Sequence, residues 1–93
     1  MRRYKAQNYN LYKIVFEPTW VQRALGTFYI VARNKNEAEN WGIYIAYDSR
    51  ILGSEAEFYA KAVKVKAPKS VIQRLLREGD GTTYRGCPVY IAE

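Results

Sequence analysis

Residues 58–79 read FYAKAVKVKAPKSVIQRLLREG, and this stretch decides the fold class because its hydrophobic period changes partway along. Up to Lys66, valines alternate with lysines, which is the two-residue period of a strand with one face in water. After Pro68 the apolar residues recur at helical spacing: Val71, Ile72, Leu75 and Leu76. Gly79 is well placed to end that helix. A strand followed directly by an amphipathic helix predicts an α+β protein.

The strand in this stretch is expected to bury its valines. Val63 and Val65 share one face with Lys61, whereas Lys64 and Lys66 share the other. We therefore expect the valine face to pack against the protein and the other face to contact water. Lys61 should then lie near an end or an edge of the strand.

Two further strands are predicted upstream. Residues 11–17 alternate in polarity, and residues 28–32 (FYIVA) are rich in strand formers. The connection between them, residues 18–25, fits a short helix with Pro18 at its first position and Gly26 just past its end. It fits the far end of a long hairpin equally well, so both readings stay open.

A helix is predicted to begin near Asn36, because Glu39 follows the asparagine at the spacing of a capping box. Ala38, Trp41 and Ile45 then recur at helical spacing, which predicts that Trp41 is a core residue. Near the end of the chain, residues 84–91 suggest a final strand or small hairpin. Pro88 would place that strand at a sheet edge.

The predicted order is therefore strand, strand, helix, strand, helix, strand. Two amphipathic helices on one face of a mostly antiparallel sheet would bury both apolar stripes. A length of 93 residues allows one domain, 1–93, and residues 1–8 are expected to be a flexible basic N-terminus.

The composition argues against an enzyme. The chain has no histidine, the commonest general base and metal ligand, and Cys87 alone makes no disulfide or thiolate metal site. No residues show the spacing of a catalytic or phosphate-loop motif, so we expect no cofactor and no bound metal. There is no apolar run of membrane-spanning length, and the basic N-terminal residues lead into no apolar segment, so we expect no signal peptide and a cytoplasmic protein with no membrane partner. The role of Cys87 and the oligomeric state stay open.

The charge is positive and segregated. The chain carries a net +6: residues 1–33 hold six basic residues and one acidic residue, residues 34–60 hold two and five, and residues 61–93 hold seven and three. The last segment contains a basic series that runs from the predicted strand into the predicted helix: Lys61, Lys64, Lys66, Lys69, Arg74 and Arg77. Such a series can follow the phosphates of a nucleic acid.

Aromatic residues are the second binding signal, because exposed rings stack on bases and form protein-interface hot spots. The chain has nine tyrosines, and the candidates for exposure are Tyr4, Tyr9, Tyr29, Tyr59, Tyr84 and Tyr90. Among them Tyr29 is the preferred stacking residue, and Trp20 is a candidate anchor for a partner.

Together these features predict a non-enzymatic binding module that engages nucleic acid or a nucleoprotein complex through a basic, tyrosine-rich surface. The alternative is a small protein-binding inhibitor or adaptor, for example a phage or mobile-element accessory protein that acts on a host or defence complex. The basic series favours the first function, and the uncommitted aromatic residues favour the second.

Overall fold

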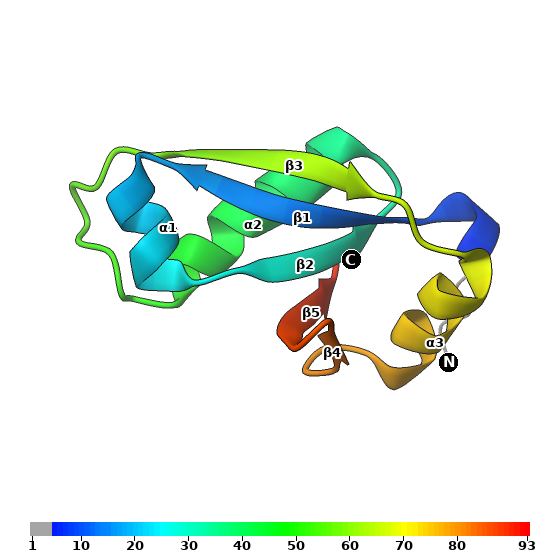
Figure 1. Ribbon diagram of the computed structural model, residues 1–93. Helices are drawn as coiled ribbons and strands as arrows, with labels where there is room; N and C mark the ends of the chain where they lie inside the picture. Colours follow the sequence, from blue (N-terminus) through cyan, green and yellow to red (C-terminus); the bar gives the residue numbers. More distant parts are fainter. Residues whose placement is uncertain (1–4) are drawn as a thin grey trace.

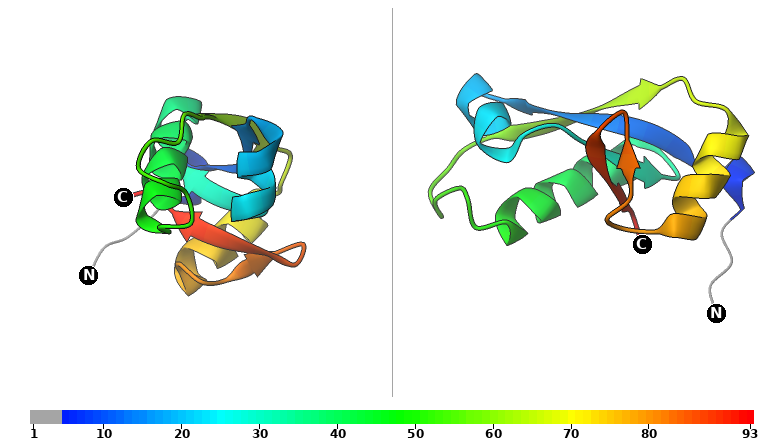
Figure 2. Two further views of the ribbon diagram at one scale, coloured as in Figure 1. Left: turned by 90° about the vertical axis from the view of Figure 1, so that its left-hand side faces the viewer. Right: turned by 60° about the horizontal axis from the view of Figure 1, so that its bottom comes forward.

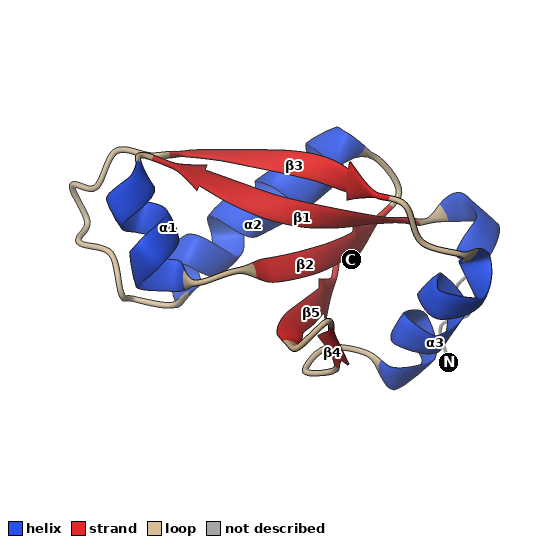
Figure 3. Ribbon diagram, viewed as in Figure 1, coloured by secondary structure: helices blue, strands red, loops and turns tan. Residues whose placement is uncertain are grey.

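The computed structural model describes residues 5–93 and has the α+β class expected from the sequence (Figures 1 and 3). A mixed sheet of five strands is accompanied by three α-helices and a short 3-10 helix. The strands are β1 (Asn10–Glu17), β2 (Phe28–Ala32), β3 (Tyr59–Val65), β4 (Thr83–Tyr84) and β5 (Cys87–Ile91). The helices are η1 (Ala6–Asn8), α1 (Thr19–Leu25), α2 (Lys35–Asp48) and α3 (Lys69–Glu78). The predicted order of strands and helices is confirmed, with the last strand present as a β4–β5 hairpin.

The strand order in the sheet is β3-β1-β2-β5-β4. β1 pairs antiparallel with both β2 and β3, and β4 pairs antiparallel with β5. β2 and β5 form the one parallel pair among the described strands. The sheet is therefore mostly antiparallel, as predicted. β3 therefore forms one edge, and the two-residue strand β4 forms the other. β5 lies between β2 and β4, so the expected edge position of the strand that contains Pro88 is wrong. Pro88 itself pairs with Thr83 of β4, and the pairing of β5 with β2 begins at Val89.

The two long helices cover opposite faces of the sheet, which corrects the expectation that both share one face. Tyr12, Ile14 and Ile30 belong to the core beneath α2, whereas Leu11 and Val31 belong to the core beneath α3. Successive strand residues point to opposite faces, so this alternation separates the two cores. Figure 2 (right) shows the β4–β5 hairpin lying between α2 and α3.

Small residues bring α2 close to the sheet. Ala38, Gly42 and Ala46 are its buried residues, and a Cβ atom at Gly42 would lie 3.1 Å from Cγ2 of Ile14. These small helix residues leave room for larger strand side chains in the core beneath α2, such as Ile14. The larger Trp41 lies at the side of α2 and is only partly buried, so it borders the core instead of filling it.

The same packing reverses the expected orientation of β3. Ala62 is buried on the α2 face, whereas Val63 is 48% exposed on the opposite face. The expectation that the valine face packs inward is therefore wrong for Val63, although Val65 is half-buried near α3. The alanines occupy the covered face because α2 approaches closely there.

The open question about residues 18–25 is answered by α1, a short helix that follows Pro18 and ends at Gly26. Gly26 has φ of 76°, a conformation that glycine adopts without steric cost. Residues 5–8 also differ from the flexible segment that was expected, because η1 forms there and Ala6 is buried in the α3 core. Residues 1–4 of that segment lie outside the described residues.

Candidate functional site

A hollow with a volume of about 490 Å³ runs along the unpaired edge of β3. Lys61 and Lys64 come from β3 itself, and Lys35 comes from the first residue of α2. Ala62, Val63 and the buried Tyr12 complete the lining. Within residues 5–93, none of the three lysines forms an ion pair. The hollow therefore concentrates positive charge from two separate segments of the chain.

The sheet face next to this hollow is open. It is the α3 face, but α3 packs at the end where β1 begins and β3 ends, and the rest of both strands has no helix over it (Figure 1). Lys13 is opposite Val63, and Glu17 is opposite Tyr59. Tyr59 is 78% exposed, and Lys13 and Lys61 are exposed on the same face. Lys13 and Lys61 are diagonal neighbours in this register, which places such residues roughly 7–8 Å apart.

We call this combined area the lysine surface, and it consists of Lys13, Lys35, Tyr59, Lys61, Val63 and Lys64. Its cations come from β1, α2 and β3. Paired strand backbone holds the lysines of β1 and β3, and the first turn of α2 holds Lys35, so none of them depends on a flexible loop. Such an arrangement can bind an extended anion across two strands.

Glu39 contacts the same edge from α2. Its Oε2 accepts a hydrogen bond of 2.9 Å from the backbone N–H of Ala62, which points away from β1. A paired N–H is less available to another strand, and lysines on an edge also disfavour strand addition. The edge is therefore better suited to side-chain recognition of an anion than to backbone pairing with a second strand.

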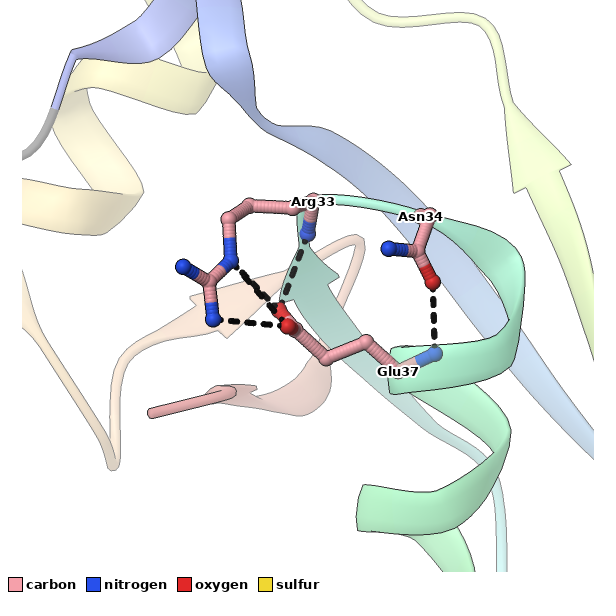
Figure 4. A network of polar contacts seen from close by, with 3 residues as sticks. All are labelled: Arg33, Asn34 and Glu37. Atoms are coloured by element: carbon pink, nitrogen blue, oxygen red, sulfur yellow. Dashed lines mark hydrogen bonds and ion pairs between the residues drawn. The ribbon is translucent and has the colours of Figure 1, made fainter.

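A polar network fixes the start of α2 beside Lys35 (Figure 4). Asn34 caps the helix by accepting a hydrogen bond from the N–H of Glu37 at 2.8 Å. Arg33 donates to the Glu37 carboxylate through both its backbone and its side chain. The predicted cap at Asn36 with Glu39 is therefore wrong by two residues, because Asn34 and Glu37 fill these roles.

The ionisation of this network follows from its contacts. Partial burial of Glu37 opposes its ionised form, but hydrogen bonds from Arg33 and the positive charge of Arg33 outweigh that effect and lower the pKa of Glu37. The hydrogen bond and charge of Glu37 in turn raise the pKa of Arg33. Arg33 is thus committed to an internal ion pair, whereas Lys35 is not.

The other cations of the predicted series have different surroundings. Lys66 is exposed just after β3, and Arg77 is exposed on α3. Lys69 donates to the backbone carbonyl of Tyr9 at 2.6 Å, and Arg74 forms a 3.0 Å ion pair with Glu78. The structure therefore brings Lys61 and Lys64 into one site and leaves the α3 cations outside that hollow.

The two predicted aromatic residues also differ. Tyr29 is only 7% exposed, and its ring packs edge-on against Tyr84 with centroids 5.2 Å apart. It therefore cannot present its face to a base, and the expectation of a stacking role for Tyr29 is wrong. Trp20 is 52% exposed on α1, which leaves its ring accessible.

Sequence reasoning missed Lys13 and Lys35 as members of the site. Lys13 alternates with buried residues of β1, a signal that it faces the other side of its strand, but only the pairing of β1 with β3 places it beside Lys61. Lys35 directly follows the Asn34 cap, so correct identification of that cap would have placed it at the helix start.

Metal ligands, free thiols and membrane-spanning helices are the other features of interest among the described residues. Over residues 5–93, no group of three or more Cys, Asp or Glu side chains is arranged to hold a metal ion. Cys87 is a half-buried free thiol. No helix in this part of the chain is long and apolar enough to cross a membrane.

Comparisons with protein-family models, curated proteins and solved structures gave no match to this chain. Its function must therefore be argued from the geometry of its own surfaces.

Proposed function

We propose that this protein is a non-catalytic module that binds single-stranded nucleic acid, alone or within a nucleoprotein complex, across the lysine surface. The observation that carries the proposal is the hollow at the β3 edge, lined by Lys35, Lys61 and Lys64. These cations lack ion-pair partners within residues 5–93, so their charge is available to an anionic ligand.

Phosphates are the ligand groups that fit this charge. A lysine ammonium binds phosphate as a point charge, and each contact releases counterions from the nucleic acid. With Lys13 included, four lysines face the hollow and the adjoining open face. For a single strand, four phosphate contacts correspond to a log–log salt slope of about −2.8.

Tyr59 favours a single strand over a duplex. Its ring is largely exposed on the same face as Lys13 and Lys61. Exposed aromatic rings stack on unpaired bases, whereas a duplex keeps its bases within its own stack. Tyr59, Lys13 and Lys61 thus offer base stacking and phosphate contacts on one face of the sheet. Lys64 and Lys35 extend the positive charge around the β3 edge.

Fluorescence anisotropy with labelled 12-nucleotide DNA and RNA single strands and a matched duplex tests the proposal at about 50 and 200 mM salt. We expect the single strands to bind more tightly than the duplex and to weaken steeply with salt. Tyr59→Ala should weaken binding by about 1–3 kcal/mol, the usual worth of one stacked base. Tyr59→Phe should retain it.

The matched charge control is at the opposite edge of the sheet. Lys61→Glu and Arg85→Glu change the net charge equally, but Arg85 lies in the β4–β5 turn, four strand spacings or about 19 Å from β3. Lys61→Glu should weaken binding and flatten the salt slope by about 0.7, whereas Arg85→Glu should change both little. Equal effects of the two variants, or no binding at the lower salt concentration, would contradict the proposal.

A second candidate function is that of a small inhibitor or adaptor that binds a protein, as a phage or mobile-element accessory protein would. It is favoured by exposed aromatic side chains outside the lysine surface, in particular Trp20, Tyr44 and Tyr47. A pull-down with nuclease treatment separates the two functions. A partner retained after nuclease digestion supports the second, and loss of all partners supports the first.

A further inference from the structure

A second hollow, with a volume of about 320 Å³, lies between α2 and β5 on the sheet face that α2 covers. Trp41 and Tyr44 line it from α2, and Tyr90 lines it from β5. Trp41 and Tyr44 lie with their ring centroids 5.5 Å apart, and Tyr44 is 58% exposed. The hollow is therefore walled by aromatic rings, of which Tyr44 is exposed and Trp41 and Tyr90 are half-buried.

Two carboxylates complete this hollow, from Asp48 at the end of α2 and Asp80 in the loop after α3. Asp80 is held in place because its Oδ1 accepts a hydrogen bond of 2.7 Å from the N–H of Ile91. Among residues 5–93, no lysine or arginine lines the hollow, although the whole chain has fifteen of them. Its charge is thus opposite to that of the protein as a whole.

The position of Asp48 adds to this negative charge. It is the last residue of α2, where the partial negative charge of the helix end disfavours a carboxylate, and the last turn contains no basic residue. A cation bound in the hollow would offset both the carboxylate and the helix end. This charge pattern is independent of the aromatic lining, and both favour a cationic ligand.

From this geometry we infer that the aromatic hollow binds an arginine side chain presented by a basic segment of a partner protein. A guanidinium stacks on aromatic faces and pairs with carboxylates through its planar edge, so it matches both kinds of lining group. The aromatic and acidic composition and the charge complementarity select a basic protein segment over a nucleic acid. This binding does not depend on the proposed nucleic-acid function, because it uses none of the residues of the lysine surface.

Trp41 provides a direct readout in a Trp20→Phe background, because the chain has only two tryptophans. We would titrate this protein with a hexapeptide containing three arginines and with a matched peptide containing three glutamates. The arginine peptide should produce a saturable change in Trp41 fluorescence, and the glutamate peptide should produce none. A response to neither peptide, or an equal response to both, overturns the inference.

Amide substitutions test the carboxylates without changing their size. Asp48→Asn and Asp80→Asn should each weaken binding of the arginine peptide by roughly 5- to 30-fold. Asparagine at position 80 can still accept the bond from Ile91, and far-ultraviolet circular dichroism confirms that each variant is folded. Lys61→Glu is the control, and it should not weaken peptide binding. Unchanged affinity in both amide variants overturns the inference.

A second copy of the chain is the alternative occupant of the hollow. Sedimentation velocity at increasing protein concentration distinguishes it, because a dimer abolished by Asp48→Asn would assign the hollow to self-association. A monomer at all concentrations, together with saturable peptide binding, supports the inference.

Discussion

The two faces of the sheet differ in what their helices leave uncovered. On the α3 face, the open parts of β1 and β3 present Lys13, Tyr59 and Lys61. On the α2 face, the hollow beside β5 presents aromatic rings with Asp48 and Asp80. The two helices lie on opposite faces and neither covers its whole face, so one small sheet exposes two surfaces of opposite charge. The net charge of +6 conceals this division.

The two helices also differ in the side chains that they pack against the sheet. α2 packs closely over β1 and β3 because its buried residues are alanines and a glycine. α3 instead buries the larger side chains Ile72, Leu75 and Leu76. The small residues of α2 pack against large strand side chains, among them Ile14 and Ile30. The exposed residues on the other side of β1 and β3 belong to the lysine surface, whereas the hollow beside β5 is lined by α2, β5 and the loop after α3.

The largest expected effect is a loss of stability. It distinguishes a strand position that a helix covers from one that no helix covers. Ile14 is fully buried beneath α2, whereas Val63 lies on the open face. Ile14→Ala should lower the free energy of unfolding by about 2–5 kcal/mol through loss of buried surface and creation of a cavity. Val63→Ala should lower it by less than about 1 kcal/mol, the span of strand propensity. Urea denaturation measures both.

Comparable losses from Ile14→Ala and Val63→Ala would contradict the orientation of β3 described above. They would mean that the valine face is buried, as the alternation of the sequence first suggested.

An intermediate effect is expected at the start of α2, which carries Lys35 to one surface and Trp41 to the other. Asn34→Ala removes the acceptor for the N–H of Glu37 and should lower stability by about 1 kcal/mol. Asn36→Ala is the matched control, because Asn36 lies inside the helix and is not its cap. Equal losses in urea denaturation would show that Asn34 does not cap α2.

The smallest effect concerns pH. The pKa of Glu37 is lower in the folded protein than in the unfolded chain, so its ion pair with Arg33 stabilises the fold above the unfolded pKa of about 4.3. That contribution is lost as the pH falls through the lower folded pKa. The stability difference between the wild type and Glu37→Gln should therefore shrink between about pH 5 and pH 3. A difference that is constant over this range would contradict the assignment.

Sequence reasoning predicted the strands and helices because their hydrophobic periods are clear, as in the stripe of Ile72, Leu75 and Leu76. It failed where tertiary packing determines which of the two faces of a strand is buried. Ala62 and Val63 differ little in their preference for burial, and the close approach of α2 decided between them. Tyr29 was misjudged because the parallel pairing of β5 with β2 brings the β4–β5 hairpin and its Tyr84 alongside.

The candidate site was predicted only in part. Lys61 and Lys64 were identified because they belong to one continuous basic series. Lys13 joins them through strand pairing with a segment about fifty residues away, which charge counting along the chain does not detect. The aromatic hollow was not predicted for the same reason, because Asp48 ends α2 and Asp80 lies in the loop after α3, far away in the sequence.

The central claim is that the two surfaces are separate and select ligands of opposite charge. Backbone chemical-shift mapping by two-dimensional NMR tests it directly, with titration of one ¹⁵N-labelled sample by a 12-nucleotide single strand and a second by the arginine peptide. The nucleic acid should shift residues around Lys13, Tyr59 and Lys61, and the peptide should shift residues around Trp41 and Asp48. Nucleic-acid shifts centred on α2 and β5, or the same set of shifts for both ligands, would contradict the account.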